Sequence, residues 1–241
     1  MKVKNISLIG MGPGNSELLT VGALNALSDA DIIIGAKRMI EGIRQLYSDK
    51  NYIIEYKTDE ILKIIRETEN CNIALLFSGD LSLFSGSQKL YLRLKDLQKD
   101  ERAEYFDIKI FPGISCLSYL CGKSNIDISK VKILSFHGKS DMLYNNIVSN
   151  RYTFVITSNA DGVREICKRL LSFKLPNLRI TLGENLSYPD KKISVDTPEN
   201  TLASDISDLN CMIIGNPDAV CVRDFGLDDD LFLRDKVPMT K

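Results

Sequence analysis

The sequence predicts an α/β protein of two domains, and three observations support this. Short apolar, β-branched runs typical of buried strands recur along the chain, separated by stretches with helical spacing. Several of these runs end in glycine-rich loops, as strands of a parallel sheet do beside a ligand site. The alternation restarts after residue 130, and 241 residues suffice for two hydrophobic cores. We therefore expect a mostly parallel sheet in the first domain and a mixed sheet in the second.

The stretch at residues 6–19 organises the first domain. An apolar run ends at Gly10, a turn continues through Gly12 to Gly14, and an amphipathic helical pattern follows. The glycines allow close approach of a ligand to the backbone, and Pro13 makes the turn rigid. Pro13 and Gly14 break the GxGxxG spacing of a dinucleotide fold. The same residues also fit a tight turn that binds nothing, so this loop alone leaves both interpretations open.

The rest of the first domain follows the same alternation. Asn15 or Ser16 is expected to cap the first helix. That helix is expected to end near Ser28-Asp29, and a second helix is expected at 59–69. Strands are expected at residues 31–35, 52–55, 72–77 and 106–111.

Glycine-containing loops also follow the last two of these strands. Ligands gather outside the carboxyl ends of strands in open α/β sheets, so residues 78–86 and 112–115 are expected to share one site with the first loop. Asp80 is a candidate to orient a ligand hydroxyl or ammonium group, or else it caps the following helix. Ser115 is placed to meet the same ligand, or it serves only as an N-cap.

The second half of the chain repeats the alternation without repeating the sequence. Strands are expected at residues 131–136, 152–157, 178–184, 192–195 and 211–215, and helices at 117–121 and 163–171. The resulting division is an N-terminal domain at 1–113, a C-terminal domain at 114–225 and a charged tail or linker at 226–241.

Composition excludes several classes of protein. A formal net charge of −1 offers no general attraction to nucleic acid or to an acidic membrane surface. The six cysteines form no close CxxC pair, which favours free buried thiols over a disulfide framework or a zinc site, and the single histidine disfavours a metal site further. The N-terminus lacks a signal-peptide pattern and no apolar run reaches membrane-spanning length, so we expect a cytoplasmic protein.

Three loops together resemble a known family. Gly10-Met11-Gly12-Pro13-Gly14, the loop at 78–86 (SGDLSLFSG) and Pro112-Gly113-Ile114-Ser115 are similar, in order and spacing, to the signature loops of the tetrapyrrole methylases. The resemblance covers residues 3–225. Two positions depart from the family pattern: Leu81 stands where proline is usual, and Asn15 stands where many members have aspartate.

Two later segments narrow the resemblance. Residues 134–139 (LSFHGK) and 183–193 (GENLSYPDKKI) are similar to segments of the branch that methylates carbon 5 of the corrin precursor in cobalamin biosynthesis. The tail at 228–241 resembles the junction that leads, in fused versions, into a decarboxylating carbon-15 methyltransferase.

The resemblance implies a cofactor and the residues that contact it. The cofactor of the family is S-adenosylmethionine, and methyl transfer from its sulfonium depends mainly on positioning. Asp80 would accept hydrogen bonds from its polar end, and Leu83 and Leu186 would pack its apolar parts. The implied cofactor contacts are Pro13, Ser78, Gly79, Asp80, Leu83, Ser115, Cys116, Thr157 and Leu186.

The implied substrate is a macrocycle edged with carboxylates, which needs an apolar trough with scattered cations. Lys37, Arg38, His137 and Lys139 are the candidates for its rim, although Lys37 and Arg38 also fit a solvated helix start. His137 is the candidate for a contact to a side-chain carboxylate or for a proton acceptor, or else it binds a backbone carbonyl at a strand end. No catalytic base is assigned and no metal is expected.

The resemblance also implies partners. They are a homodimeric second copy and the decarboxylating carbon-15 methyltransferase, either as a separate protein or fused to this chain. Whether cobalt is already in the substrate stays open. The alternatives are another enzyme of this fold, such as a precorrin-4 or uroporphyrinogen methyltransferase or an enzyme that modifies diphthamide or ribosomal RNA, and a non-enzymatic nucleotide-binding regulator. The regulator would explain the first loop but not the two that follow.

Overall fold

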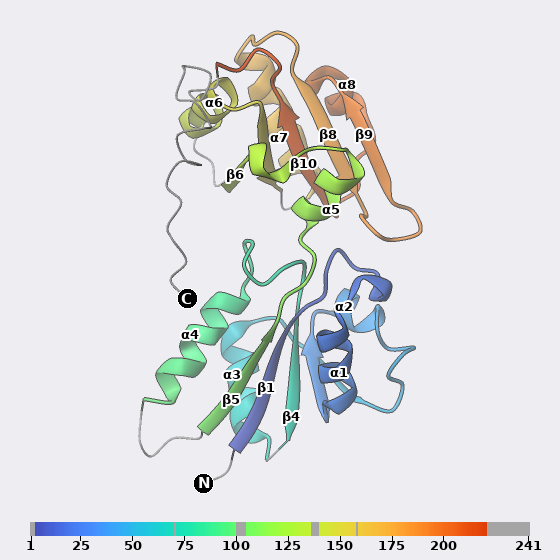
Figure 1. Cartoon of the computed structure of the whole chain (residues 1–241), viewed down its shortest axis with the longest axis vertical. Helices are drawn as coiled ribbons and strands as arrows, with labels where there is room; N and C mark the ends of the chain where they lie inside the picture. Colours follow the sequence, from blue (N-terminus) through green and yellow to red (C-terminus); the bar gives the residue numbers. More distant parts are fainter. Residues whose placement is uncertain (1–2, 70, 100–104, 136–139, 158, 221–241) are drawn as a thin grey trace, which may run out of the picture. The chain divides into compact units, whose positions relative to one another are not determined.

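The computed structural model describes residues 3–69, 71–99, 105–135, 140–157 and 159–220 (Figure 1). The chain divides into two compact units. The first is Met1–Asn125 with Asn185–Lys191, and the second is Ile126–Glu184 with Lys192–Lys241. This division differs from the expected boundary after residue 113, because the helix that follows and the later segment 185–191 both group with the first unit.

The first unit contains a five-stranded, fully parallel sheet in the order β3-β2-β4-β1-β5. The central strands β2 and β4 are nearly continuous apolar runs, as expected for strands covered on both faces. The strands are β1 (Val3–Gly10), β2 (Ile32–Gly35), β3 (Asn51–Ile54), β4 (Asn72–Phe77) and β5 (Tyr105–Phe111).

Helices cover both faces of this sheet (Figure 1). α1 (Val21–Asp29) and α2 (Lys37–Glu41) pack on one face around Ile9 and Ile33. α3 (Thr58–Glu67) and α4 (Ser87–Leu97) pack on the other face around Ile6 and Leu8. Neighbouring positions of a strand point to opposite faces, so β1 and β2 contribute side chains to both cores. α5 (Cys116–Lys123) follows β5.

The second unit contains a mixed five-stranded sheet in the order β6-β7-β10-β8-β9. β6 and β7 are parallel, and the other neighbouring pairs are antiparallel. The strands are β6 (Val131–Ser135), β7 (Tyr152–Ile156), β8 (Arg179–Glu184), β9 (Lys192–Asp196) and β10 (Asn210–Gly215). The predicted fold class, a parallel sheet followed by a mixed sheet, is confirmed.

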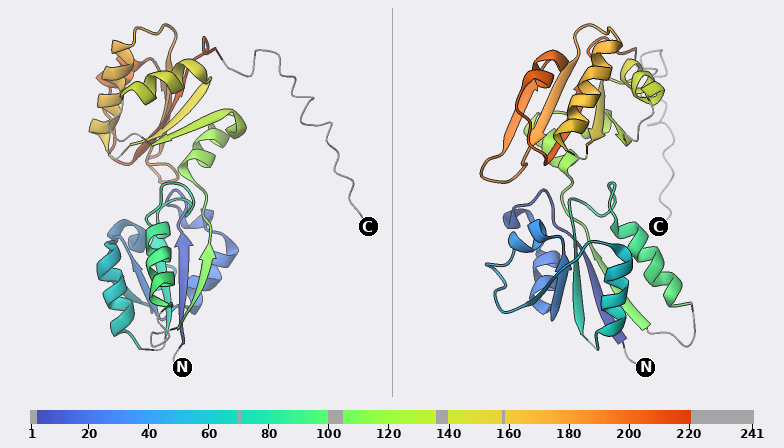
Figure 2. Two further views of the ribbon diagram at one scale, coloured as in Figure 1. Left: turned by 90° about the vertical axis from the view of Figure 1, so that its left-hand side faces the viewer. Right: turned by 180° about the vertical axis from the view of Figure 1, so that it is seen from behind.

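One face of the second sheet is covered by helices. They are α6 (Ser140–Ser149), α7 (Ala160–Ser172) and α8 (Pro198–Ala203), and the view from behind in Figure 2 shows α7 lying over the sheet. α7 buries Val163, Ile166, Cys167 and Leu170, which helical spacing places on one side. No helix in the described ranges is long and apolar enough to span a membrane.

The start of the first helix differs from the prediction. Asn15 does act as a cap, but of a short 3-10 helix at Ser16–Leu18. The Glu17 N–H donates to the Asn15 side-chain oxygen at 2.9 Å. α1 begins only at Val21, where the Thr20 hydroxyl accepts a hydrogen bond from the Ala23 N–H at 3.2 Å. Two caps in succession divide what the apolar spacing presented as one helix.

Candidate functional site

The three glycine-rich loops meet in the first unit, at the carboxyl end of its parallel sheet. Gly12 and Gly79 form an isolated antiparallel bridge, in which Gly12 N–H donates to Gly79 O at 3.1 Å and Gly79 N–H donates to Gly12 O at 2.9 Å. Met11 N–H donates to Phe77 O at 2.8 Å just before this bridge. The loops that follow β1 and β4 are therefore joined through their backbones.

The third loop completes this arrangement through close backbone contacts. A Cβ added to Gly10 would lie 2.6 Å from Gly113 N and 2.8 Å from Gly79 O, and a Cβ on Gly113 would lie 2.5 Å from Gly10 O. These distances leave no space for a side chain at either position. The absence of side chains allows the three loops to touch, as expected from their shared position at strand ends.

Gly79 also presents an open surface. Its φ of +68° lies in the left-handed region that favours glycine, and a Cβ added there would meet nothing within 4 Å. A ligand can thus approach this peptide closely. The half-buried Gly79 lies between the exposed Ser78 and the half-buried Asp80.

Asp80 folds its own loop. Its Oδ1 accepts hydrogen bonds from the Ser82 N–H at 2.8 Å and from the Ser82 hydroxyl. Its backbone carbonyl accepts from the Leu83 N–H at 3.4 Å. The interpretation of Asp80 as a helix cap is wrong, because α4 begins at Ser87 after Gly86 and has no side-chain cap. The structure records no partner for Asp80 Oδ2 among the described residues, so this oxygen can accept from a ligand.

Ser115 and Cys116 begin α5 at the third loop. The Ser115 hydroxyl accepts from the Ser118 N–H at 2.9 Å, which confirms the expected N-cap. Ser115 is buried and Cys116 half-buried. Among the described cysteines, all five are free thiols: Cys71, Cys116, Cys121, Cys167 and Cys211.

Leu186 lies in a segment that also belongs to the first unit. Residues 185–191 connect β8 to β9, and Leu186 within them is 5% exposed. Asn15 N–H donates to the Ser187 hydroxyl at 2.9 Å, so this segment contacts the loop that follows β1. Tyr188 packs against Gly14, where a Cβ would overlap its ring.

Two of the expected substrate cations, Lys37 and Arg38, are the first residues of α2. This position agrees with the alternative interpretation, in which they belong to a helix start. Lys37 is exposed and forms an ion pair with Glu41 at 3.8 Å. Arg38 is engaged instead: its Nη1 donates to the Tyr188 hydroxyl at 2.7 Å and its Nη2 to the Ser78 hydroxyl at 3.2 Å. Tyr188 and Ser187 were not among the site residues expected from the sequence. Their partners lie 150 and 172 positions away along the chain, so no local spacing indicates them.

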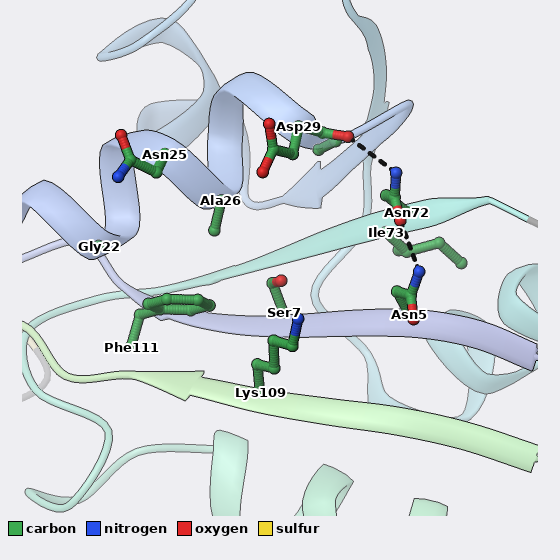
Figure 3. A pocket seen from close by; sticks show the side chains of 11 residues that line it. Asn5, Ser7, Gly22, Asn25, Ala26, Asp29, Asn72, Ile73, Lys109 and Phe111 are labelled. Atoms are coloured by element: carbon green, nitrogen blue, oxygen red, sulfur yellow. Dashed lines mark hydrogen bonds between the residues drawn. The ribbon is translucent and has the colours of Figure 1, made fainter.

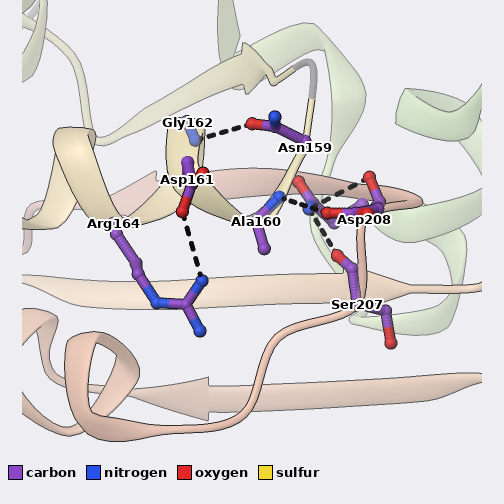
Figure 4. Close-up of polar contacts among 8 residues, drawn as sticks. Asn159, Ala160, Asp161, Gly162, Arg164, Ser207 and Asp208 are labelled. Atoms are coloured by element: carbon purple, nitrogen blue, oxygen red, sulfur yellow. Dashed lines mark hydrogen bonds and ion pairs between the residues drawn. The ribbon is translucent and has the colours of Figure 1, made fainter.

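Thr157 belongs to the second unit. It follows β7, and its hydroxyl donates to the backbone and side-chain oxygens of Asn210. α7 begins just beyond, where Asn159 accepts from the Gly162 N–H at 3.0 Å and Asp208 accepts from the Ala160 N–H at 3.2 Å (Figure 4). His137 and Lys139 lie outside the described residues.

A cavity in the first unit lies apart from these loops. It has a volume of about 220 Å³ and opens between α1 and the strands β1 and β5 (Figure 3). Asn5 and Ser7 of β1, Asn25 of α1, and Lys109 and Phe111 of β5 are among its lining residues. It includes none of the expected site residues. Among the described residues, no cluster of three or more His, Cys, Asp or Glu side chains could hold a metal ion.

The fold is that of solved methyltransferases. It resembles the precorrin-6Y methylase of Archaeoglobus fulgidus with a TM-score of 0.62 and 23% identity, over 89% of this chain and 98% of that one. It also resembles the uroporphyrin-III C-methyltransferase of Thermus thermophilus complexed with S-adenosylhomocysteine, with a TM-score of 0.67 and 17% identity, over 88% and 92% of the two chains.

Comparison of the sequence then identifies the family of methyltransferases. A family model described as Tetrapyrrole (Corrin/Porphyrin) Methylases matches residues 5–202, and the chain belongs to this family. Among its relatives is a "Probable cobalt-precorrin-7 C(5)-methyltransferase" of Methanocaldococcus jannaschii, 29% identical over 86% of this chain and 96% of the relative. Another is the "Cobalt-precorrin-7 C(5)-methyltransferase" of Salmonella typhimurium, 26% identical over 78% and 88%.

Proposed function

We propose that this chain is an S-adenosylmethionine-dependent C-methyltransferase that methylates carbon 5 of cobalt-precorrin-7, or of its cobalt-free counterpart, in cobalamin biosynthesis. The observation that carries the proposal is the interlocked set of loops after β1, β4 and β5, in a chain that belongs to the tetrapyrrole methylases. The names of the relatives supply the substrate and the position of the methyl group.

The residues present fit the cofactor. S-Adenosylmethionine carries an ammonium group, a ribose diol and an adenine, and it supplies an electrophilic methyl group on a sulfonium. Asp80 Oδ2 is suited to accept from the ammonium or the diol, because Oδ1 is held by Ser82. The open peptide at Gly79 allows a planar or bulky group to lie against the backbone. Pro13, Ser78, Leu83, Ser115, Cys116 and Leu186 complete the first unit's proposed contacts, and Thr157 is proposed from the second.

Catalysis by such a site is mainly positional. An in-line displacement at a methyl group needs the nucleophilic carbon and the methyl carbon held in line, and rigid loops supply that geometry. The backbone bridge between Gly12 and Gly79 and the close contact of Gly10 with Gly113 provide rigidity. Lys37 is proposed to face a substrate carboxylate, together with His137 and Lys139, and His137 is also the candidate proton acceptor.

A ligand titration tests the cofactor assignment. We expect isothermal titration calorimetry to detect S-adenosylhomocysteine binding and to detect neither ATP nor NAD at the same concentration. Asp80→Asn is expected to weaken S-adenosylhomocysteine binding by about tenfold, since it removes the charge of one hydrogen-bond acceptor. Asp107→Asn is the control, because Asp107 is paired with Lys109 in mid-strand at 3.8 Å. Binding of ATP or NAD in preference would contradict the proposal and favour a nucleotide-binding regulator.

We also propose that the protein is a homodimer in the cytoplasm. Its proposed partner is a decarboxylating carbon-15 methyltransferase, which would use its product as substrate. The support is the resemblance of residues 228–241 to the junction found in fused versions, and the free thiols fit a reducing compartment. Light scattering during size-exclusion chromatography would measure the mass of the chain alone and with that enzyme added. A monomeric mass, unchanged by the second enzyme, would contradict both parts.

A further inference from the structure

Arg38 joins two parts of the first unit that lie far apart in the sequence. One guanidinium nitrogen donates to the Tyr188 hydroxyl at 2.7 Å, and the other donates to the Ser78 hydroxyl at 3.2 Å. The guanidinium carbon lies 6.0 Å from the centroid of the Tyr188 ring. The planar fork of arginine can serve two acceptors at once, whereas the single nitrogen of lysine reaches them less well.

The ring of Tyr188 has a second contact, with the glycine-rich loop after β1. Gly14 has a φ of +137°, and a Cβ at this position would overlap the ring. The next residue, Asn15, donates its N–H to the Ser187 hydroxyl at 2.9 Å. Ser187 and Tyr188 thus hold the first loop, while Tyr188 is itself held by Arg38.

The segment at 185–191 is shaped to present this tyrosine. Asn185 and Ser187 have left-handed φ values of 44° and 69°. Tyr188 N–H donates to Asn185 O at 2.9 Å, and Lys191 N–H donates to Tyr188 O at 3.1 Å. Asn185 Nδ2 donates to Asp190 Oδ2 at 2.7 Å. These bonds make a compact turn, in which the proposed cofactor contact Leu186 lies two residues before Tyr188.

We propose that Arg38 and Tyr188 are positioning residues of the cofactor site, and that Arg38 is not a contact to the substrate's carboxylates. Arg38 holds Ser78 in the second loop. Through Tyr188 it also holds the first loop and the turn that carries Leu186. The pair therefore sets the spacing of three groups of proposed cofactor contacts. This inference rests on the proposed function, in which these loops bind S-adenosylmethionine.

Variants of the two residues test the inference. We expect Arg38→Met and Tyr188→Phe each to raise the Kd for S-adenosylhomocysteine and the KM for S-adenosylmethionine about fivefold to tenfold, the net scale of one hydrogen bond. The KM for the tetrapyrrole should stay within about twofold, because neither side chain touches it in this account. Arg38→Lys should recover part of the lost affinity. Arg44→Met is the matched control, since Arg44 lies over the Tyr52 ring at 5.1 Å and should change neither constant.

The double variant measures whether the two residues act together. The Kd of the double variant Arg38→Met/Tyr188→Phe for S-adenosylhomocysteine should be little higher than that of the weaker-binding single variant, because both substitutions remove the same hydrogen bond. Additive losses would overturn the inference. So would an Arg38→Met protein that keeps the wild-type Kd for S-adenosylhomocysteine while its KM for the tetrapyrrole rises, since that result makes Arg38 a substrate contact.

A measurement without ligand separates this inference from the proposed function. Hydrogen exchange of the amides in 185–191 should be faster in Arg38→Met than in the wild-type protein, and unchanged in Arg44→Met. Wild-type protein that fails to bind S-adenosylhomocysteine contradicts the proposed function, whatever the exchange shows. Unchanged exchange in Arg38→Met contradicts the link between Arg38 and Tyr188, even where the wild-type protein binds the cofactor.

Discussion

At the scale of single residues, the absence of side chains at Gly10 and Gly113 determines whether the three loops can meet. A Cβ on Gly10 would lie 2.6 Å from Gly113 N, a distance that Cβ atoms essentially never show. The neighbouring atoms are backbone, which cannot rotate away as the end of a flexible side chain can. A methyl group here has to separate the strand ends that form the candidate site.

Gly113→Ala is expected to lower the free energy of unfolding by about 2 kcal/mol or more, through overpacking against Gly10 and Gly79. It should also abolish S-adenosylhomocysteine binding, which calorimetry would detect.

The matched control is Gly122→Ala. Gly122 lies within α5, and a Cβ there meets nothing within 4 Å. Alanine should stabilise this helix by about 0.5–1 kcal/mol. Equal effects of the two substitutions would refute the close packing described for the loops.

At the scale of elements, apolar runs predicted every strand in the described residues, because a buried strand needs apolar side chains on one or both faces. Helices with a wide apolar face, such as α7, were predicted for the same reason. α6 and α8 were missed. Among the side chains of α6 whose burial is described, Leu143 and Ile147 are buried, which is a narrow apolar face. α8 has six residues, although Thr197 followed by Pro198 is a capping signal that could have indicated it.

Strand ends predicted the loops of the site, because chain direction places the carboxyl ends of parallel strands at one edge. The order of the strands and the contact of Tyr188 with Gly14 depend on tertiary packing, for which a local pattern contains no information. This is why the sequence indicated Arg38 as a substrate-binding cation or as part of a solvated helix start, whereas the structure shows it bonded to Tyr188 and Ser78.

The cap of α5 offers a prediction for this helix. Ser115→Ala is expected to lower the free energy of unfolding by about 1 kcal/mol, because the Ser118 N–H loses its acceptor. Urea denaturation would measure the change.

Ser124→Ala, at the other end of α5, is the control. The buried Ser124 hydroxyl has no hydrogen-bond partner among the described residues, so its removal should be neutral or stabilising. A larger loss from Ser124→Ala than from Ser115→Ala would show that the cap does not stabilise α5.

At the scale of the whole molecule, each unit has its own hydrophobic core. The core of the second unit includes Cys167, which is 0% exposed. Burial, with a smaller contribution from the Glu199 carboxylate, raises the pKa of the Cys167 thiol to about 11 from its ordinary value of 9.0. The thiol therefore stays neutral in the folded protein at pH values where it ionises in the unfolded chain.

The sign of the pH dependence follows from this shift. The stabilisation from the neutral thiol is fully present below pH 9 and is lost as the pH rises to about 11. The free energy of unfolding should fall over this interval. The free energy of unfolding of Cys167→Ala should fall less steeply over the same interval. Because the other titrating groups are present in both proteins, the difference between the two profiles reports on Cys167. Parallel pH profiles for the two proteins, measured by urea denaturation, would show that Cys167 does not contribute.

Methylation of carbon 5 of the corrin precursor can be tested by a transfer assay. The purified chain would be incubated with S-adenosylmethionine and cobalt-precorrin-7, or with the cobalt-free macrocycle, and the product analysed by mass and by the position of the new methyl group. We expect one added methyl group at carbon 5 and no loss of carbon dioxide. A methyl group at another carbon, or no transfer by a protein that binds S-adenosylhomocysteine, would contradict this expectation.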